Sequence, residues 1–187
     1  NLLNEGIVFE QAVQLEKLNT LYELLLGPNF IVSQVSASVK RTTPKPFAIH
    51  ADMNGYEQPF PGHSVIATSI FCCDEFTEDA GATRFVPGSH HLRRHPVSGE
   101  GESEAVAVAA PAGSIILWDG AMWHGNCPRT RPGERVVLHL TCNRQNVRPI
   151  ESYTGIDPEV LRRNPPEFAA LLGLTDRWER REMVRDR

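Results

Sequence analysis

Apolar residues recur at helical spacing near the start of the chain. Between residues 11 and 26, the leucines at positions 15, 18, 21, 25 and 26 have a spacing that places them on one face of a helix. Gly27 and Pro28 follow directly, and this pair is typical of the end of a helix. The pattern therefore predicts one amphipathic helix over residues 11–26.

Most later apolar residues occur in short runs that are typical of β-strands. Residues 30–39 alternate between apolar and polar side chains, as in a strand with one buried face. Residues 64–73 are rich in β-branched and aromatic residues and predict a buried strand. Further strands are expected at residues 82–87, 105–109, 114–118 and 135–142. Turns or loops are expected at residues 42–46, 74–80, 92–104, 111–113 and 125–134, and the polar segment 92–104 is expected to be mobile.

After Arg148 the pattern changes to short helices. These are expected at residues 158–163, 166–172 and 175–186, and the last of them, with mixed charges, is expected to be solvated. Many short strands with helices before and after them indicate an all-β sandwich or barrel with flanking helices. A jelly roll is a common way to close such strands around a site. The sequence thus predicts a single, mainly β domain over residues 1–187, with residues 150–187 as its helical C-terminal extension.

The composition narrows the functional classes. With 187 residues, of which 41% are hydrophobic, the chain is long enough to bury a core. The net charge of −4 gives no broad basic surface, so nucleic acid is not an expected partner. No apolar run approaches the roughly 18 residues that a membrane span requires. The chain begins with Asn1 rather than methionine, and we expect that residues before it are missing.

The four cysteines indicate reduced thiols. They are Cys72, Cys73, Cys127 and Cys142, and no two of them form a CxxC pair. The side chains of the adjacent Cys72 and Cys73 would point to opposite faces of a strand. We therefore favour reduced thiols in a cytoplasmic protein over a disulfide framework, and we do not expect a cysteine-rich zinc site.

A histidine and an aspartate lie two residues apart, directly after the apolar run FAI. In an extended segment, side chains two residues apart face the same way, so the imidazole of His50 and the carboxylate of Asp52 project to one side. The spacing is common, and alone it favours a surface histidine and a turn aspartate.

A second histidine changes this interpretation. His124 follows the apolar run SIILW and the turn DGAM, so we expect it at the end of a strand. Two histidines and one carboxylate with open positions form the facial triad of non-haem Fe(II) oxygenases. A zinc site accepts the same ligands. The sequence therefore predicts that His50, Asp52 and His124 hold one redox-active metal, with Fe(II) favoured.

The other histidines are expected to have different roles. His139 lies between apolar neighbours in VVLHLT, which favours an inward-facing strand residue over a metal ligand. His63 follows Pro61 and Gly62 and is a candidate for the mouth of a pocket. A loop is favoured for the cluster of His90, His91 and His95, because the neighbouring Arg93 and Arg94 would repel a metal ion.

Arg135 is a candidate anion-binding residue. It lies eleven residues after His124 and opens the strand 135–142, so its guanidinium can point along the same interior. A buried arginine opposite a metal needs an anionic partner, and a guanidinium pairs well with a carboxylate. A dicarboxylic keto acid fits, since its keto-acid end chelates iron while its distal carboxylate meets Arg135. Arg129 and Arg131, in the turn PRTRPGE, are expected to be exposed.

Taken together, the motifs resemble those of the phytanoyl-CoA dioxygenase family of Fe(II)/2-oxoglutarate-dependent oxygenases. The resemblance begins near Leu24 and runs to Arg135 and beyond, and the order and spacing of its elements are specific. Those elements are LLLGPN (24–29), HAD (50–52), GATRFVPGSH (81–90), AGSIILWDGAMWHGN (112–126) and Arg135.

The resemblance implies a double-stranded β-helix fold in which the predicted triad binds iron. It also implies that Arg135 anchors the distal carboxylate of 2-oxoglutarate. Asn126 stands where relatives often have a hydroxyl residue that helps to bind this carboxylate, and its amide can donate the same hydrogen bond. Thr83 matches a threonine that contacts 2-oxoglutarate in some similar enzymes of natural-product biosynthesis.

The implied reaction uses Fe(II), O2 and 2-oxoglutarate to oxidise a small organic substrate, with release of succinate and CO2. Some related enzymes are halogenases, in which a small residue replaces the carboxylate ligand. Because Asp52 is present, hydroxylation or another oxidation is expected instead. Trp118, Met122 and Trp123 are expected to shape either the substrate pocket or the core.

Two other classes stay open on the residues alone. One is a cupin-like protein that binds a metal or small molecule without 2-oxoglutarate turnover. The other is a metal-free structural β-sandwich, which leaves the clustering of the candidate ligands unexplained. The sequence identifies neither the substrate nor the oligomeric state.

Overall fold

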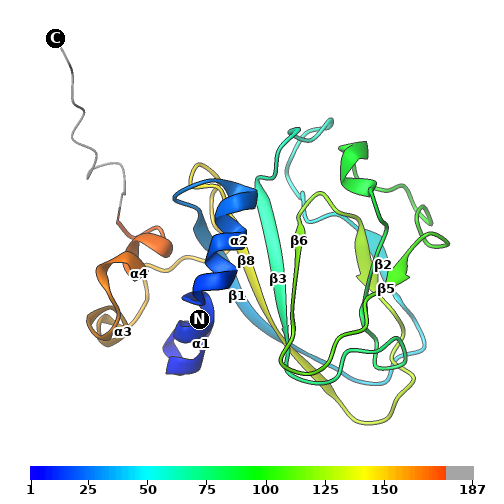
Figure 1. The fold of residues 1–187 in the computed structure, drawn as a ribbon, viewed down its shortest axis with the longest axis horizontal. Helices are drawn as coiled ribbons and strands as arrows, with labels where there is room; N and C mark the ends of the chain where they lie inside the picture. The colour runs from blue at the N-terminus through cyan, green and yellow to red at the C-terminus, as the bar shows by residue number, and fades with distance from the viewer. Residues whose placement is uncertain (176–187) are drawn as a thin grey trace.

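The computed structural model describes residues 1–175 and shows two β-sheets, with helices along the outer side of one of them (Figure 1). Three helices precede the strands: the 3-10 helix η1 (Leu2–Asn4), α1 (Ile7–Val13) and α2 (Glu16–Leu26). Two helices follow them, α3 (Pro158–Arg163) and α4 (Pro166–Leu171). None of the helices in residues 1–175 has the length and apolar character that a bilayer crossing requires.

The first sheet is antiparallel, with strand order β1-β8-β3-β6. Its strands are β1 (Ile31–Lys40), β3 (Ile66–Cys72), β6 (Ile115–Asp119) and β8 (Arg135–Asn143). The pairing of β1 with β8 extends from Ile31↔Asn143 to Lys40↔Arg135, with one register shift between Val32 and Gln34. Because side chains alternate along a strand, one face of this sheet packs against helices and the other faces the second sheet.

The second sheet is built from shorter strands in the order β2-β7-β4-β5. Its strands are β2 (Phe47–His50), β4 (Thr83–Phe85), β5 (Val106–Ala107) and β7 (His124–Asn126). The two sheets share no hydrogen-bonded strand pair within the described residues, so the structure is an open sandwich rather than a closed barrel.

The largest hydrophobic cluster lies between the helices and the outer face of the first sheet. Leu18, Tyr22 and Leu26 of α2 pack there with Leu138 and Leu140 of β8. The buried Tyr22 hydroxyl donates to the carbonyl of Leu140 at 2.6 Å, and this hydrogen bond connects α2 to β8. The outer face is thus closed by helices, and the inner face is left for the site.

The C-terminal helices belong to the same cluster. Phe168 and Leu171 of α4 are buried in it. Glu10 of α1 is buried and forms an ion pair with Arg163 of α3, which joins α1 to α3. The predicted helices 158–163 and 166–172 are confirmed, and the prediction for 175–186 lies outside the described residues from position 176 onward.

The mainly β fold with flanking helices is confirmed, but the prediction of a single helix over residues 11–26 is wrong. Two helices occupy residues 7–26, and the backbone of Leu15 is extended between them. The amide of Gln14 donates to the Glu10 carbonyl at 3.0 Å and to Oδ1 of Asn164 at 2.8 Å. Asn164, which lies 150 residues after Gln14, thus stabilises the break between the two helices. The local sequence pattern does not reveal this contact.

One predicted loop differs from the structure, and another is confirmed from residue 93 onward. The turn expected at residues 125–134 is shorter, because β7 pairs with both β2 and β4. The segment expected at 92–104 follows the 3-10 helix η2 (Ser89–Leu92) and contains no strand. Arg94 donates twice to Glu100 within it, at 2.7 and 2.6 Å. Its mobility stays a prediction.

Candidate metal centre

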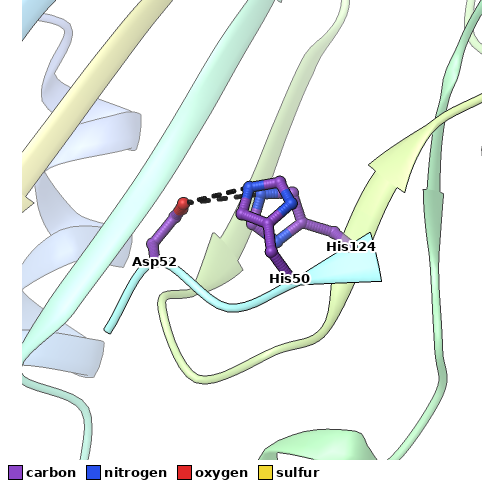
Figure 2. Close-up of side chains that lie close together, drawn as sticks. All are labelled: His50, Asp52 and His124. Carbon is purple, nitrogen blue, oxygen red and sulfur yellow. Dashed lines mark ion pairs between the residues drawn. The ribbon is translucent and has the colours of Figure 1, made fainter. Parts of the chain in front are cut away.

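The two candidate histidine ligands come from neighbouring strands of the second sheet. His50 ends β2, His124 begins β7, and the two are direct partners in the antiparallel pairing. Their ring centroids lie 4.3 Å apart. Asp52 follows β2 by two residues, and its Oδ1 lies 3.7 Å from Nε2 of His50 and 3.6 Å from Nε2 of His124 (Figure 2). The structure thus brings one nitrogen of each ring and one carboxylate oxygen together.

Backbone carbonyls hold both imidazoles in one orientation. Nδ1 of His50 donates to the carbonyl of Ala48 at 3.0 Å, and Nδ1 of His124 donates to that of Met122 at 2.9 Å. Each bond keeps the proton on Nδ1, because a carbonyl oxygen only accepts. Nε2 of each ring is therefore free as a ligand, an arrangement common to histidines that bind metals.

Two donors from the opposite sheet hold the carboxylate of Asp52. Its Oδ2 accepts from Oγ1 of Thr68 on β3 at 3.1 Å and from Nε1 of Trp118 on β6 at 3.3 Å. Thr68 and Trp118 are themselves cross-strand partners. Since both donors engage Oδ2, Oδ1 is left to face the imidazoles. The resulting donor set, with its ligand atoms within 4.8 Å of one another, fits a divalent transition metal.

Burial also favours the ligand form of His124. Burial lowers the pKa of His124 from its usual value, and the negative charge of Asp52 only partly offsets this effect. A lowered pKa favours the neutral imidazole, which is the form that coordinates a metal ion.

Gly125 allows β7 to approach β2 closely. A Cβ at this position would lie 2.5 Å from the carbonyl oxygen of Phe47 and 3.1 Å from that of Ala48. Any side chain there would push β2 away from β7. Because His50 and His124 lie on these two strands, the glycine permits the spacing of the two ligands.

The three side chains open into a cavity of about 450 Å³ between the sheets. This volume lies in the range of small-molecule sites. Much of its wall is polar and comes from β1 and β8. The polar residues on these strands are Gln34, Ser36, Ser38, His139, Thr141 and Asn143. Thr83 and Asn126 line the same cavity as direct cross-strand partners, so the structure brings both beside the triad.

Arg135 lies buried at the far end of the same interior, on the face of β8 that also carries His139. It does not line the cavity wall itself. Its Nη1 donates to the carbonyl of Gly81, and its guanidinium lies 4.4 Å from the ring centroid of Phe76. Its Nε has no hydrogen-bond partner, and no carboxylate of residues 1–175 forms an ion pair with it. Burial lowers the pKa of Arg135 to about 10, and the charge of Asp74 offsets this effect only in part.

The sequence of residues 2–136 matches the family of phytanoyl-CoA dioxygenases (PhyH). The matched region contains the triad and Arg135. This chain belongs to the phytanoyl-CoA dioxygenase family. A similar protein, dioxygenase af480 of Aspergillus fumigatus, is 29% identical over 159 residues, which make up 83% of this chain and 51% of the relative. Dioxygenase cdmA of Talaromyces verruculosus is 30% identical over 107 residues, or 56% of this chain and 35% of the relative.

The chain spans about half or less of the length of these two relatives. Solved structures share its fold at low sequence identity. HygX of Streptomyces hygroscopicus, with nickel, 2-oxoglutarate and hygromycin B bound, has a TM-score of 0.64 at 13% identity, over 77% of this chain and 68% of HygX. The nickel complex of the non-heme monooxygenase ThoJ has a TM-score of 0.57 at 23% identity, over 75% of this chain and 55% of ThoJ. This member of the phytanoyl-CoA dioxygenase family thus has the jelly-roll, double-stranded β-helix fold, as predicted.

The expectation of an exposed Arg129 is wrong for this family member. Arg129 is only 4% exposed, and the turn that carries it wraps around its guanidinium. It donates to the carbonyls of Ala80 at 3.1 Å, Pro132 at 2.9 Å and Gly133 at 3.2 Å. Arg131 is exposed and pairs with Glu75 at 2.9 Å, as expected of a surface arginine.

The remaining histidines lie apart from the candidate ligands. His139 faces the cavity from β8 and forms a hydrogen bond with Ser38 at 3.0 Å, which confirms an inward-facing strand residue. His63 lines a separate pocket with His90 and His91, so its position at a pocket is confirmed. The loop expected at His90 and His91 is wrong, because both belong to the 3-10 helix η2.

Sequence reasoning missed the residues that hold Asp52. Thr68 lies in a strand that is rich in β-branched residues, and no feature of the local sequence distinguishes it from the other residues of that strand. Trp118 was expected to shape either the pocket or the core, and it lines the cavity, whereas Trp123 is 1% exposed and lies in the core. The alternating run SQVSAS at residues 33–38 was the available signal for a polar cavity wall.

Proposed function

We propose that this chain is the catalytic part of an Fe(II)/2-oxoglutarate-dependent dioxygenase that oxidises a small organic molecule and releases succinate and CO2. The observation that carries the proposal is the preset triad: both imidazoles have Nε2 free, and Asp52 has one oxygen held and one oxygen free. A metal-free structural β-sandwich does not need two carbonyls that orient imidazoles, or two buried donors that orient a carboxylate.

In this proposal His50, Asp52 and His124 hold Fe(II). The bound iron supplies the activation of O2 that is coupled to decarboxylation of 2-oxoglutarate. The protein's own groups orient the reactants, and Ala48, Met122, Thr68 and Trp118 keep the ligands in place.

Arg135, Thr83 and Asn126 would bind the distal carboxylate of 2-oxoglutarate. The buried, unpaired guanidinium of Arg135 supports this role, because a buried cation without a counterion is costly unless an anion joins it. Thr83 and Asn126 offer a hydroxyl and an amide as further donors from adjacent strands. HygX, which shares the fold, is a protein solved with 2-oxoglutarate bound.

We further propose hydroxylation, or a related oxidation, rather than halogenation. Asp52 provides a carboxylate at the third ligand position, and two donors already hold it toward the histidines. A halide would need that position to be vacant.

The test is succinate release under Fe(II), O2 and 2-oxoglutarate across a panel of small substrates, including acyl thioesters, amino acids and natural-product intermediates. His124→Ala should abolish substrate-linked succinate formation, whereas His91→Ala, at an exposed histidine outside the cavity, should retain it. Full turnover by His124→Ala would overturn the ligand assignment.

A binding experiment separates this function from a cupin-like metal-binding protein. An anaerobic Fe(II) complex that develops a visible absorption band with 2-oxoglutarate supports the proposal. Tight Fe(II) binding without any response to 2-oxoglutarate would favour the cupin-like alternative.

A further inference from the structure

A second cation stands directly beside Arg135. Lys40 is the last residue of β1 and is the cross-strand partner of Arg135, the first residue of β8. Directly opposed side chains in an antiparallel pair lie on the same face, with Cβ atoms about 4.5–5.5 Å apart. Ser38 and Ser36, two and four residues earlier on β1, line the cavity. The side chain of Lys40 therefore leaves β1 on the cavity side.

Lys40 and Arg135 reach the same two backbone segments. Nζ of Lys40 donates to the carbonyl of Cys127 at 3.0 Å, next to Asn126. The stem of Lys40 lies so close to Gly81 that a Cβ on that glycine would come within 2.9 Å of Cε. The carbonyl of Gly81 is also the acceptor for Nη1 of Arg135. The two cations thus converge where the chain presents Thr83 and Asn126 to the cavity.

This corner of the protein has too few anions for its cations. Neither Lys40 nor Arg135 forms an ion pair with any carboxylate among residues 1–175. Burial, and then the charge of Arg135, lower the pKa of Lys40 to about 8. The other charged or titratable groups that interact with the pair are Arg84, Arg129, Asp74, Cys72, Cys127 and His139.

These neighbours offset the charge of the pair only in part: the charge of Asp74 raises the pKa of Arg135, but no ion pair forms between them. Arg84 is already paired with Glu102, and Arg129 is bound to backbone carbonyls. Asp74, the acidic group of the set, accepts from the backbone N–H of Val136 at 2.7 Å. Burial raises the pKa of the Cys127 thiol, which keeps it uncharged. Two cations that face one interior without a counterion are the arrangement expected of a site for an anion.

We propose that Lys40 is a second binding residue for the distal carboxylate of the keto-acid co-substrate, acting with Arg135; this inference rests on the proposed function. Arg135 meets the carboxylate from β8 and Lys40 from β1. The ammonium group adds a donor and a charge on the side of Asn126. A charge-assisted hydrogen bond of this kind contributes enough to change affinity about tenfold.

The experiment compares two keto acids on the nickel-loaded protein by titration calorimetry. 2-Oxoglutarate carries the distal carboxylate, and 2-oxopentanoate has the same chain length without it. Lys40→Met keeps the apolar stem against Gly81 and removes the charge. It should raise the Kd for 2-oxoglutarate about tenfold and leave the Kd for 2-oxopentanoate within about twofold of wild type.

Two controls frame this result. Lys40→Arg should recover most of the affinity for 2-oxoglutarate, since it restores a cation. Lys45→Met removes the same charge at an exposed position five residues along and should change neither affinity. If Lys40→Met weakens both keto acids equally, or neither, Lys40 has no role at the distal carboxylate. A wild-type protein that binds neither keto acid would instead overturn the proposed function itself.

Discussion

Replacing Thr68 with valine tests whether the opposite sheet sets the metal affinity. Valine keeps the shape of threonine and removes one of the two hydrogen bonds to Oδ2 of Asp52, the one of 3.1 Å. The bond from Trp118 at 3.3 Å remains. With one donor lost, Asp52 is freer to rotate, and its Oδ1 no longer faces the imidazoles at all times.

The expected loss of Fe(II) affinity follows from the burial of Thr68 and Asp52. A hydrogen bond to a charged acceptor contributes about 1.5–3 kcal/mol. Thr68 is buried, but the side chain of Asp52 is 26% exposed, so water replaces part of the lost bond. We therefore expect a loss near the lower limit, which corresponds to a Kd for Fe(II) raised about tenfold. Outer residues that orient metal ligands typically change affinity by about 10–100-fold.

The assay is anaerobic competition for Fe(II) against a coloured chelator. Thr141→Val is the matched control, because its hydroxyl lies 3.3 Å from that of Thr68 and makes no hydrogen bond to Asp52. It should leave the Kd for Fe(II) within about twofold of wild type. Equal affinities for Thr68→Val and wild type, or an equal loss in Thr141→Val, would refute the role assigned to the opposite sheet.

Three further predictions follow from the site. Arg135→Met should raise the Kd for 2-oxoglutarate by about two orders of magnitude while Fe(II) still binds. An unchanged Kd in calorimetry would show that Arg135 does not bind the distal carboxylate. Burial lowers the pKa of Lys40 to about 8, so raising the pH from about 7 to about 9 removes the charge of Lys40 in the free protein. The affinity for 2-oxoglutarate should therefore fall over this pH range in wild type and stay level in Lys40→Arg. Gly125→Ala should place its Cβ against the carbonyl of Phe47, separate β2 from β7 and weaken Fe(II) binding, as measured by the same chelator competition.

The candidate ligands were readable from the sequence because their signal is local. His50 and Asp52 lie two residues apart at the end of an apolar run, and His124 follows a strand and a turn. What could not be read is that His50 and His124 are cross-strand partners, since this depends on the pairing of segments 74 residues apart. The sequence therefore indicated which residues come together, and the strand pairing shows how they do so.

Other features depended on tertiary contacts from the outset. Arg129 resembled an exposed turn residue, yet its guanidinium is the centre around which that turn folds. The break between α1 and α2 is held by Asn164, which lies 150 residues after Gln14. In both cases a polar side chain satisfies distant backbone or side-chain partners, and neither hydrophobic periodicity nor local propensity carries that information.

The division of the metal centre between the two sheets has a consequence for the lifetime of the protein. His50 and His124 belong to one layer, and the donors that hold Asp52 belong to the other. A bound ion would therefore be held by residues of one layer, and Asp52 would connect it through hydrogen bonds to the other layer, with which the first shares no strand pairing in residues 1–175. Binding to the native state alone adds about 2.7 kcal/mol at a metal concentration of 100 Kd. A metal-free chain would lack this contribution, so we expect it to open between the layers more often and to be cleaved faster in limited proteolysis than the metal-loaded chain.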